Sequence, residues 1–164
     1  MSYIDSNLMS GEQVIYRAKI HWAIFLPSFV YLLIGIWIVS IGENMLSRPG
    51  QPGIAPALVF FGQIMKFLIF PLNFIKALIA KLTTELGLTS KRVIVKIGLI
   101  RRETAELNHS KVESFRVDQT VLGRLLGYGT IVVQGTGGGR TPIRGIDSPL
   151  VFRRQAMEII DNQG

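Results

Sequence analysis

One stretch near the N-terminus restricts this chain more than any other. The run from Trp22 to Gly42, WAIFLPSFVYLLIGIWIVSIG, contains no ionisable side chain. As an α-helix it spans roughly 30 Å, which is the thickness of the hydrocarbon core of a bilayer. It is too long for the apolar part of a signal peptide, and acidic residues precede it. The run predicts a transmembrane helix at 22–42 after an N-terminal segment at 1–21.

Residues 54–80 form a second apolar region, and a turn-rich connection at 43–53 separates it from the first. At 100° per residue, four of its polar side chains fall within an arc of roughly 140°. Pro71 is expected to kink this helix. The four residues, named here the polar stripe, are Gln63, Lys66, Asn73 and Lys76.

Three interpretations of residues 54–80 stay open. The helix crosses the membrane and its lysines extend toward the interface. Alternatively, it crosses with the polar stripe facing another subunit or a wet interior. In the third interpretation it lies flat in the membrane plane, and the termini then lie on opposite sides. We prefer the hairpin, because basic residues precede the first segment and follow the second, which predicts that both termini are cytoplasmic.

The pattern changes after residue 82 to alternating β-branched and polar residues with short turns. A short helical turn is expected at Val121–Leu126, closed by Gly127. The chain then ends in an amphipathic helix that is capped by Asp147 or Ser148. The expected strands are Thr83–Leu88, Arg92–Ile97, Arg101–Asn108, Val112–Asp118, Thr130–Gln134 and Thr141–Ile146. Residues 82–164 therefore predict an α+β domain of antiparallel strands covered by a helix.

Several motifs of the chain resemble one family. They are TELGLTSKRV (84–93), the Gly98 turn followed by IRR (100–102), LGRLLGYG (122–129) and, before the first apolar run, GEQVIYRAKIHW (11–22). These resemble the membrane-flanked type of bacterial pleckstrin-homology (PH) domain. The resemblance implies an α+β fold: an N-terminal transmembrane helical hairpin, then a PH-like split β-barrel of antiparallel strands with a C-terminal capping helix.

The sequence offers little for catalysis. It has no cysteine and only two histidines, His21 and His109, and its histidine, aspartate and glutamate residues show no spacing typical of metal ligands. The glycine-rich stretch QGTGGGRTP (134–142) fails the phosphate-loop pattern because Arg140 stands where a glycine is needed, and no helix is expected after it. We interpret it as a hairpin tip leading into an edge strand. No enzymatic activity, cofactor or metal is expected.

The chain is basic, with a formal net charge of +7. Acidic residues interleave with the basic ones, and no aromatic stacking platform accompanies them, so we expect no nucleic-acid partner. The resemblance to PH folds implies that the loops between the early strands of the domain can meet acidic lipid headgroups. Near an anionic leaflet each basic residue contributes about 1 kcal/mol. The candidate contacts for anionic lipid are Lys91, Arg92, Lys96, Arg101 and Arg102.

These observations predict a non-enzymatic, membrane-anchored module that acts as an oligomeric scaffold or protein-interaction platform at the cytoplasmic face of a bacterial inner membrane. Its expected partners are membrane lipids, further copies of the chain and an unidentified membrane protein. One alternative is an oligomeric pore or transport component lined by the polar stripe. Another is an adaptor that binds anionic lipid through the basic residues of the domain.

Overall fold

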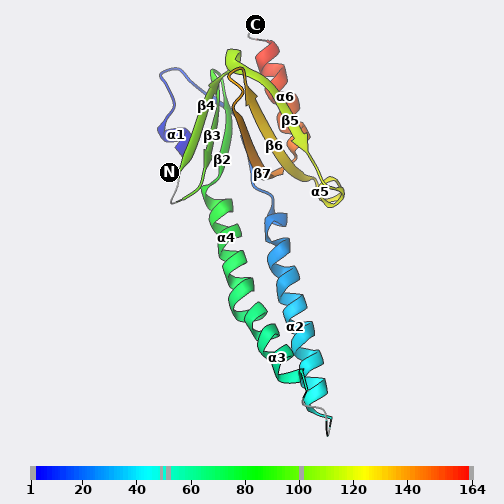
Figure 1. Ribbon diagram of the computed structural model, residues 1–164. Coiled ribbons are helices and arrows are strands. Elements are labelled where there is room, and N and C mark those ends of the chain that lie inside the picture. The colour runs from blue at the N-terminus through cyan, green and yellow to red at the C-terminus, as the bar shows by residue number, and fades with distance from the viewer. Residues whose placement is uncertain (1–2, 49, 51–52, 100–101, 163–164) are drawn as a thin grey trace. The chain divides into compact units, whose positions relative to one another are not determined.

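The computed structural model of the chain describes residues 3–48, 50, 53–99 and 102–162. The chain forms two compact units. One unit, the domain, combines Met1–Ala23 with Ile79–Gly164, and the other, the helical pair, comprises Ile24–Leu78. Figure 1 shows strands in the first unit and long helices in the second. In sequence, the helical pair is therefore an insertion into the domain.

The domain contains two antiparallel sheets. A four-stranded sheet has the order β1-β2-β3-β4, and a three-stranded sheet has the order β5-β6-β7. The first sheet consists of β1 (Val14–Ala18), β2 (Glu85–Thr89), β3 (Arg92–Ile97) and β4 (Glu103–Asn108). The second sheet consists of β5 (Val112–Asp118), β6 (Tyr128–Gly135) and β7 (Arg140–Asp147). Short helices are α1 (Tyr3–Ser6), η3 (His109–Lys111) and α5 (Val121–Leu126).

The core of the domain lies between the two sheets and the C-terminal helix α6 (Pro149–Asp161). The ring of Phe152 on α6 meets Tyr16 of the first sheet at 5.8 Å and Phe115 of the second at 5.9 Å, both edge to face. An isolated bridge between Ile20 and Ile146 joins β7 to the segment after β1. Fully buried core residues are Leu86, Leu88, Val93, Val95, Ile131, Val133, Ile143, Ile146, Phe152 and Ala156. The domain is thus a PH-like split barrel with a covering helix.

The N-terminal segment differs from its predicted role. The predicted domain begins at residue 82 and excludes residues 1–21, whereas strand β1 pairs with β2, for example Ala18 with Leu86. Val14, Tyr16 and Ala18 are half-buried, and the residues between them are exposed. This period-two pattern is typical of a strand with one buried face. The N-terminal segment therefore supplies an edge strand of the barrel.

The other elements of the domain follow the predictions closely. Gly127 ends α5 in the left-handed conformation at φ +79°, as expected for a helix C-terminus. The glycine-rich stretch is the tip of the β6–β7 hairpin, with Gln134 opposite Arg140 and Gly138 at φ +77°. Ser148 occupies the position before α6, but it does not cap the helix, since its Oγ bonds to Asp147 instead.

The second unit consists of two long apolar helices. The first runs through η1 (Trp22–Phe25) and α2 (Leu26–Leu46), and the second through α3 (Ala55–Ile64), the π-turn η2 (Met65–Ile69) and α4 (Phe70–Thr83). Both are long and apolar enough to cross a membrane, by length and composition. The π-turn η2 lies directly before Pro71, where the kink is expected: because proline has no N–H, the regular hydrogen-bond ladder cannot continue through it.

Glycines allow the two helices to approach closely. A Cβ placed on Gly42 would lie 2.7 Å from Val59 Cγ2, and one on Gly62 would lie 2.7 Å from Val39 Cγ2. A Cβ on Gly35 would lie 3.0 Å from the Cβ of Met65. Small residues at contact positions are typical of helices that associate in lipid, where close backbone approach replaces the hydrophobic effect. The packing suits a helical pair in a membrane.

Candidate functional site

A cluster of polar and charged groups in the domain is centred on Arg92, at the start of β3. Its guanidinium forms a bidentate pair with Glu12: Nε lies 3.1 Å from Oε1, and Nη2 lies 3.0 Å from Oε2. It also donates to Glu106 Oε2 at 2.5 Å and to the carbonyl of Asn7 at 2.7 Å. The Arg92 and Glu12 side chains are 7% and 0% exposed. This buried cluster fastens the N-terminal segment to the sheet.

Glu12 is held as a carboxylate. Burial by itself raises the pKa of Glu12, but three donors outweigh it and lower the pKa below its ordinary value: the N–H of Met9, the hydroxyl of Thr89 and the guanidinium of Arg92. The Met9 and Thr89 bonds are 2.7 and 2.6 Å long. The hydrogen bonds described above give each Glu12 oxygen donors as partners, so Glu12 is ionised at neutral pH.

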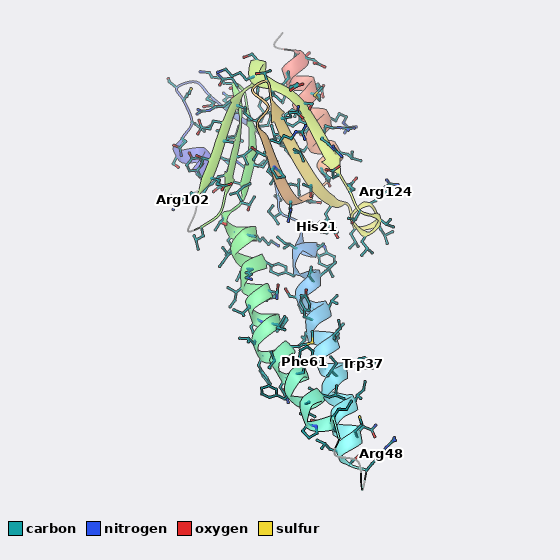
Figure 2. All side chains as sticks on the ribbon, viewed as in Figure 1. His21, Trp37, Arg48, Phe61, Arg102 and Arg124 are labelled. Atoms are coloured by element: carbon teal, nitrogen blue, oxygen red, sulfur yellow. The ribbon has the colours of Figure 1, made fainter. Side chains whose placement is uncertain are left out.

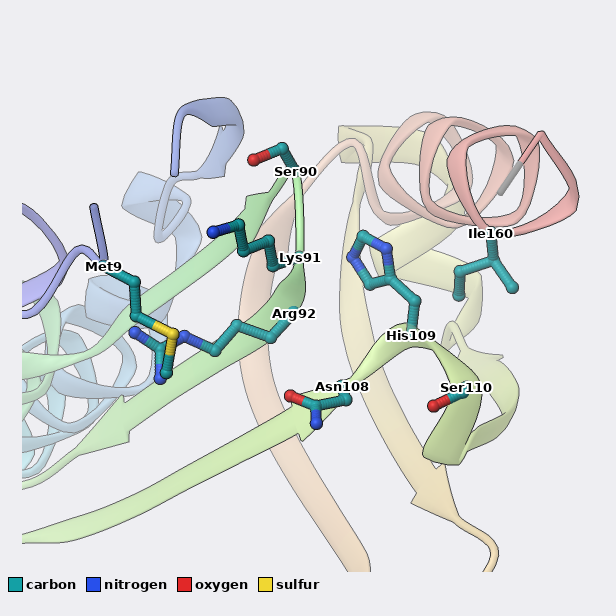
Figure 3. Close-up of a pocket in the computed structure, with 8 residues that line it drawn as sticks. All are labelled: Met9, Ser90, Lys91, Arg92, Asn108, His109, Ser110 and Ile160. Carbon is teal, nitrogen blue, oxygen red and sulfur yellow. The ribbon is translucent and has the colours of Figure 1, made fainter. Parts of the chain in front are cut away.

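A cavity of about 550 Å³ adjoins this cluster (Figure 3). In Figure 3, the side chains of Lys91 and Arg92 extend toward Met9, while His109 and Ile160 lie on the other side. Arg92 forms ion pairs with the carboxylates of Glu12 and Glu106, and Lys91 Nζ donates to the carbonyl of Ser10 at 3.1 Å. The lining residues are Met9, Ser90, Lys91, Arg92, Asn108, His109, Ser110 and Ile160. The two basic side chains that line the cavity, Lys91 and Arg92, thus hold the N-terminal segment in place.

The five candidate lipid contacts do not form one surface. Arg92 is buried in the cluster described above, so it is not a surface contact, because its charge is satisfied inside the fold. Lys96 pairs with Glu85 at 3.1 Å and lies 5.5 Å from the ring of Tyr3. Lys91 and Arg102 are exposed but stand at opposite ends of β3. Arg101 lies outside the described residues.

The polar stripe is also divided. Gln63, Lys66 and Asn73 are half-buried, whereas Lys76 is exposed. The stem of Lys66 packs on the first helix, since a Cβ on Gly35 would lie 3.1 Å from its Cγ. Asn73 Nδ2 donates to the carbonyl of Ile69 on its own helix at 2.8 Å. Gln63 Oε1 is buried and has no hydrogen-bond partner among the described residues. The stripe therefore lies partly within the helical pair.

Within residues 3–48, 50, 53–99 and 102–162, no group of three or more acidic, histidine or cysteine side chains is arranged to hold a metal ion. His21 stacks on Tyr128 with centroids 5.5 Å apart, and its Nδ1 accepts from the N–H of Ala23. His109 is buried beside the cavity. Both histidines therefore have surroundings that suit a structural role.

Glu12 is absent from the residues that the sequence singles out for the site. The visible signal was the alternation VIYRA (14–18) immediately after it, which indicates a strand. Once residues 14–18 pair with β2, an acidic residue just before them lies beside the β2–β3 turn and hence beside Arg92. Only the pairing of β1 with β2 shows that Glu12 and Arg92 are neighbours.

An antiparallel split barrel with a covering helix, interrupted in sequence by two helices that are long and apolar enough to cross a membrane, defines a PH-like protein. The model of the bacterial PH domain family matches residues 22–163. Since the match covers most of the chain, the protein belongs to this family, and the predicted fold class is confirmed. The match begins after β1. Searches of curated proteins and of solved structures gave no match.

Proposed function

We propose that the protein is a non-enzymatic scaffold, anchored in a bacterial inner membrane by its helical pair and presenting its PH-like domain to the cytoplasm. One observation carries the proposal: β1 precedes the two apolar helices, and β2, its partner in the sheet, follows them. The domain is thus tied to the helices through two chain connections. Such double attachment suits a fixed platform better than a freely tethered module.

The same pairing bears on membrane topology. Residues 14–18 and 85–89 belong to one sheet, so both must lie on the same side of any membrane. The segment between them then crosses an even number of times. This supports a hairpin of two crossings and argues against a flat second helix, which would separate the termini. The basic residues flanking the helices favour the cytoplasmic side for the domain.

Self-association is the second part of the proposal. Lys66 and Lys76 lie on a helix that is otherwise largely apolar, and ionisable side chains within a membrane seek protein or water-lined surroundings. Gln63 adds a buried amide oxygen that no described residue satisfies. Further copies of the chain, or an unidentified membrane protein, are the partners that suit these groups.

Cysteine labelling tests the topology, because the natural chain has no cysteine. Three variants at exposed serines are compared: Ser47→Cys in the connection between the helices, Ser110→Cys in the domain and Ser6→Cys near the N-terminus. In cells with a permeable outer membrane, a membrane-impermeant maleimide should label Ser47→Cys alone. After lysis it should label all three. Equal labelling of Ser47→Cys and Ser110→Cys in intact cells would refute the hairpin. Different labelling of Ser6→Cys and Ser110→Cys would refute the conclusion that the N-terminal segment and the rest of the domain lie on the same side of the membrane.

A further inference from the structure

Three apolar side chains of helix α5 are turned outward. Val121, Leu122 and Leu125 are 88%, 60% and 79% exposed, and together they are named the α5 apolar face. The longer helix α6 buries Phe152 and Ala156 in the core, while its Leu150 and Met157 are exposed. Exposed apolar patches of this kind mark interaction surfaces.

The outward face is fixed by the local structure. The Thr120 hydroxyl accepts from the N–H of Gly123 at 3.0 Å and caps the helix. Gly123 is buried, and a Cβ there would lie 2.7 Å from the carbonyl of Tyr128, so this side of the helix must face the barrel. Gln119 Nε2 donates to the same carbonyl at 3.0 Å. Because the inner side is held in this way, the leucines cannot turn inward.

The position of α5 within the domain identifies what the face meets. We name the helix-exit end the end of the domain where the chain leaves after Ala18 and returns before Leu86. Leu86 pairs with Val95 near the end of β3, so the β3–β4 connection with Arg102 lies at this end too. The residue that follows Gly127 at the end of α5 is Tyr128, whose ring stacks on His21 between β1 and α2. Figure 2 shows Arg102, His21 and Arg124 at the same end of the domain, with Arg102 and Arg124 on opposite sides of it.

The chemistry of the helix-exit end suits a lipid surface. Besides the α5 apolar face it exposes the large apolar residues Trp22 and Leu82, at 53% and 72%. Exposed basic side chains accompany them, namely Lys19, Lys81, Arg102 and Arg124. An interfacial element of a membrane protein combines these two features: apolar groups enter the headgroup–acyl boundary, and basic groups meet lipid phosphates.

We infer that the α5 apolar face inserts into the headgroup region of the membrane that the helical pair crosses, with Arg124 directed at anionic phosphates. The inference rests on the proposed membrane anchorage. It assigns a third membrane attachment to the chain, besides the two helix connections. The domain then stands on the bilayer in one orientation, which leaves the β2–β3 turn and the cavity beside Arg92, at the opposite end of β3, facing the cytoplasm.

The test uses the full chain reconstituted in vesicles of phosphatidylcholine and phosphatidylglycerol. Leu125→Cys carries an environment-sensitive fluorophore, and Ser110→Cys, on an exposed turn at the other end of the domain, is the matched control. The Leu125 label should emit at shorter wavelength than the control and lose intensity when nitroxide-bearing lipid is included. Arg124→Glu should weaken this quenching, and omission of phosphatidylglycerol should weaken it likewise.

The outcomes separate the two proposals. Protein that does not float with the vesicles overturns both the anchorage and this inference. Protein that floats while the Leu125 label resembles the Ser110 control overturns the inference alone. A Leu125 label that is shielded in proportion to protein density, and unaffected by the nitroxide lipid, assigns the face to a second copy of the chain and also overturns the inference.

Discussion

The substitution Glu12→Gln tests whether the Arg92 cluster holds the N-terminal strand in the barrel. The change keeps the shape of the side chain and removes its charge. Both carboxylate oxygens accept from Arg92, at 3.1 and 3.0 Å. Whichever way the glutamine amide is turned, its NH₂ group therefore points at an N–H of Arg92. The variant replaces a bidentate ion pair by one hydrogen bond and one donor–donor contact.

The magnitude follows from burial. Removing one partner of a buried ion pair costs about 3–5 kcal/mol, because the other charge is left without compensation. Glu106 still lies 2.5 Å from Arg92, so the loss should be near the lower limit, about 3 kcal/mol. At 1.4 kcal/mol for each factor of ten, this corresponds to roughly a hundredfold increase in opening of β1. Such a loss is a large part of the 5–15 kcal/mol typical of a domain.

Hydrogen exchange of the detergent-solubilised full chain measures this opening, since amides of β1 exchange when the strand detaches. The matched control is Asp5→Asn, which removes an exposed ion pair with Arg17 and should change exchange little. A second control, Glu12→Leu combined with Arg92→Met, removes both charges and should restore much of the protection. If Glu12→Gln raises β1 exchange no more than Asp5→Asn does, the cluster does not fasten the strand.

The same group predicts a pH dependence. Because the pKa of Glu12 is lowered in the folded domain, its carboxylate stabilises the fold at pH values above the ordinary value of 4.5. That stabilisation is lost as the pH falls through the lowered pKa. Exchange of β1 should therefore increase on acidification in the natural chain. In Glu12→Gln it should be fast throughout and depend less on pH, after correction for intrinsic exchange rates.

Three further outcomes are expected. Gly62→Leu should destabilise the helical pair by about 1–3 kcal/mol, because the larger side chain overpacks against Val39. Thermal unfolding in detergent measures this loss, and Ala57→Leu, at an exposed position of the same helix, should not cause it; equal effects of the two variants would contradict the close packing. The detergent-solubilised chain should have the mass of a homo-oligomer by light scattering, and a strict monomer across a concentration series would remove that part of the proposal. Reconstituted protein should show no ion conductance, and an anion conductance abolished by Lys66→Ala would favour the pore alternative instead.

Local patterns were enough to predict most of the fold. Hydrophobic length indicated the helical pair, and alternation indicated β3 and β5 with the bounds that the structure has. Gly127 marked the end of α5 because glycine readily adopts the left-handed conformation that closes a helix. The strand at 14–18 was missed, since its partner lies beyond the helical pair and no local signal connects the two.

The candidate site was less predictable, because the sequence does not indicate whether a charged side chain faces solvent or pairs with an opposite charge inside the fold. Arg92 was expected at a surface, yet the pairing of β1 with β2 places Glu12 against it. Lys96 was likewise expected to face lipid and is matched by Glu85 on the neighbouring strand. Arg102 alone of the described candidates is exposed at the helix-exit end. Long-range pairing decides such cases.

The division of the barrel between two distant parts of the sequence also sets the order of events during synthesis. β1 leaves the ribosome first, but its partner β2 follows only after both apolar helices have been made. At about 5–20 residues per second, β1 waits for several seconds as an unpaired edge. In the proposed topology, a chain whose first helix crossed the membrane while the second did not would hold β1 and β2 on opposite sides, and the barrel could not close. Completion of the domain thus requires that both helices cross or that neither does.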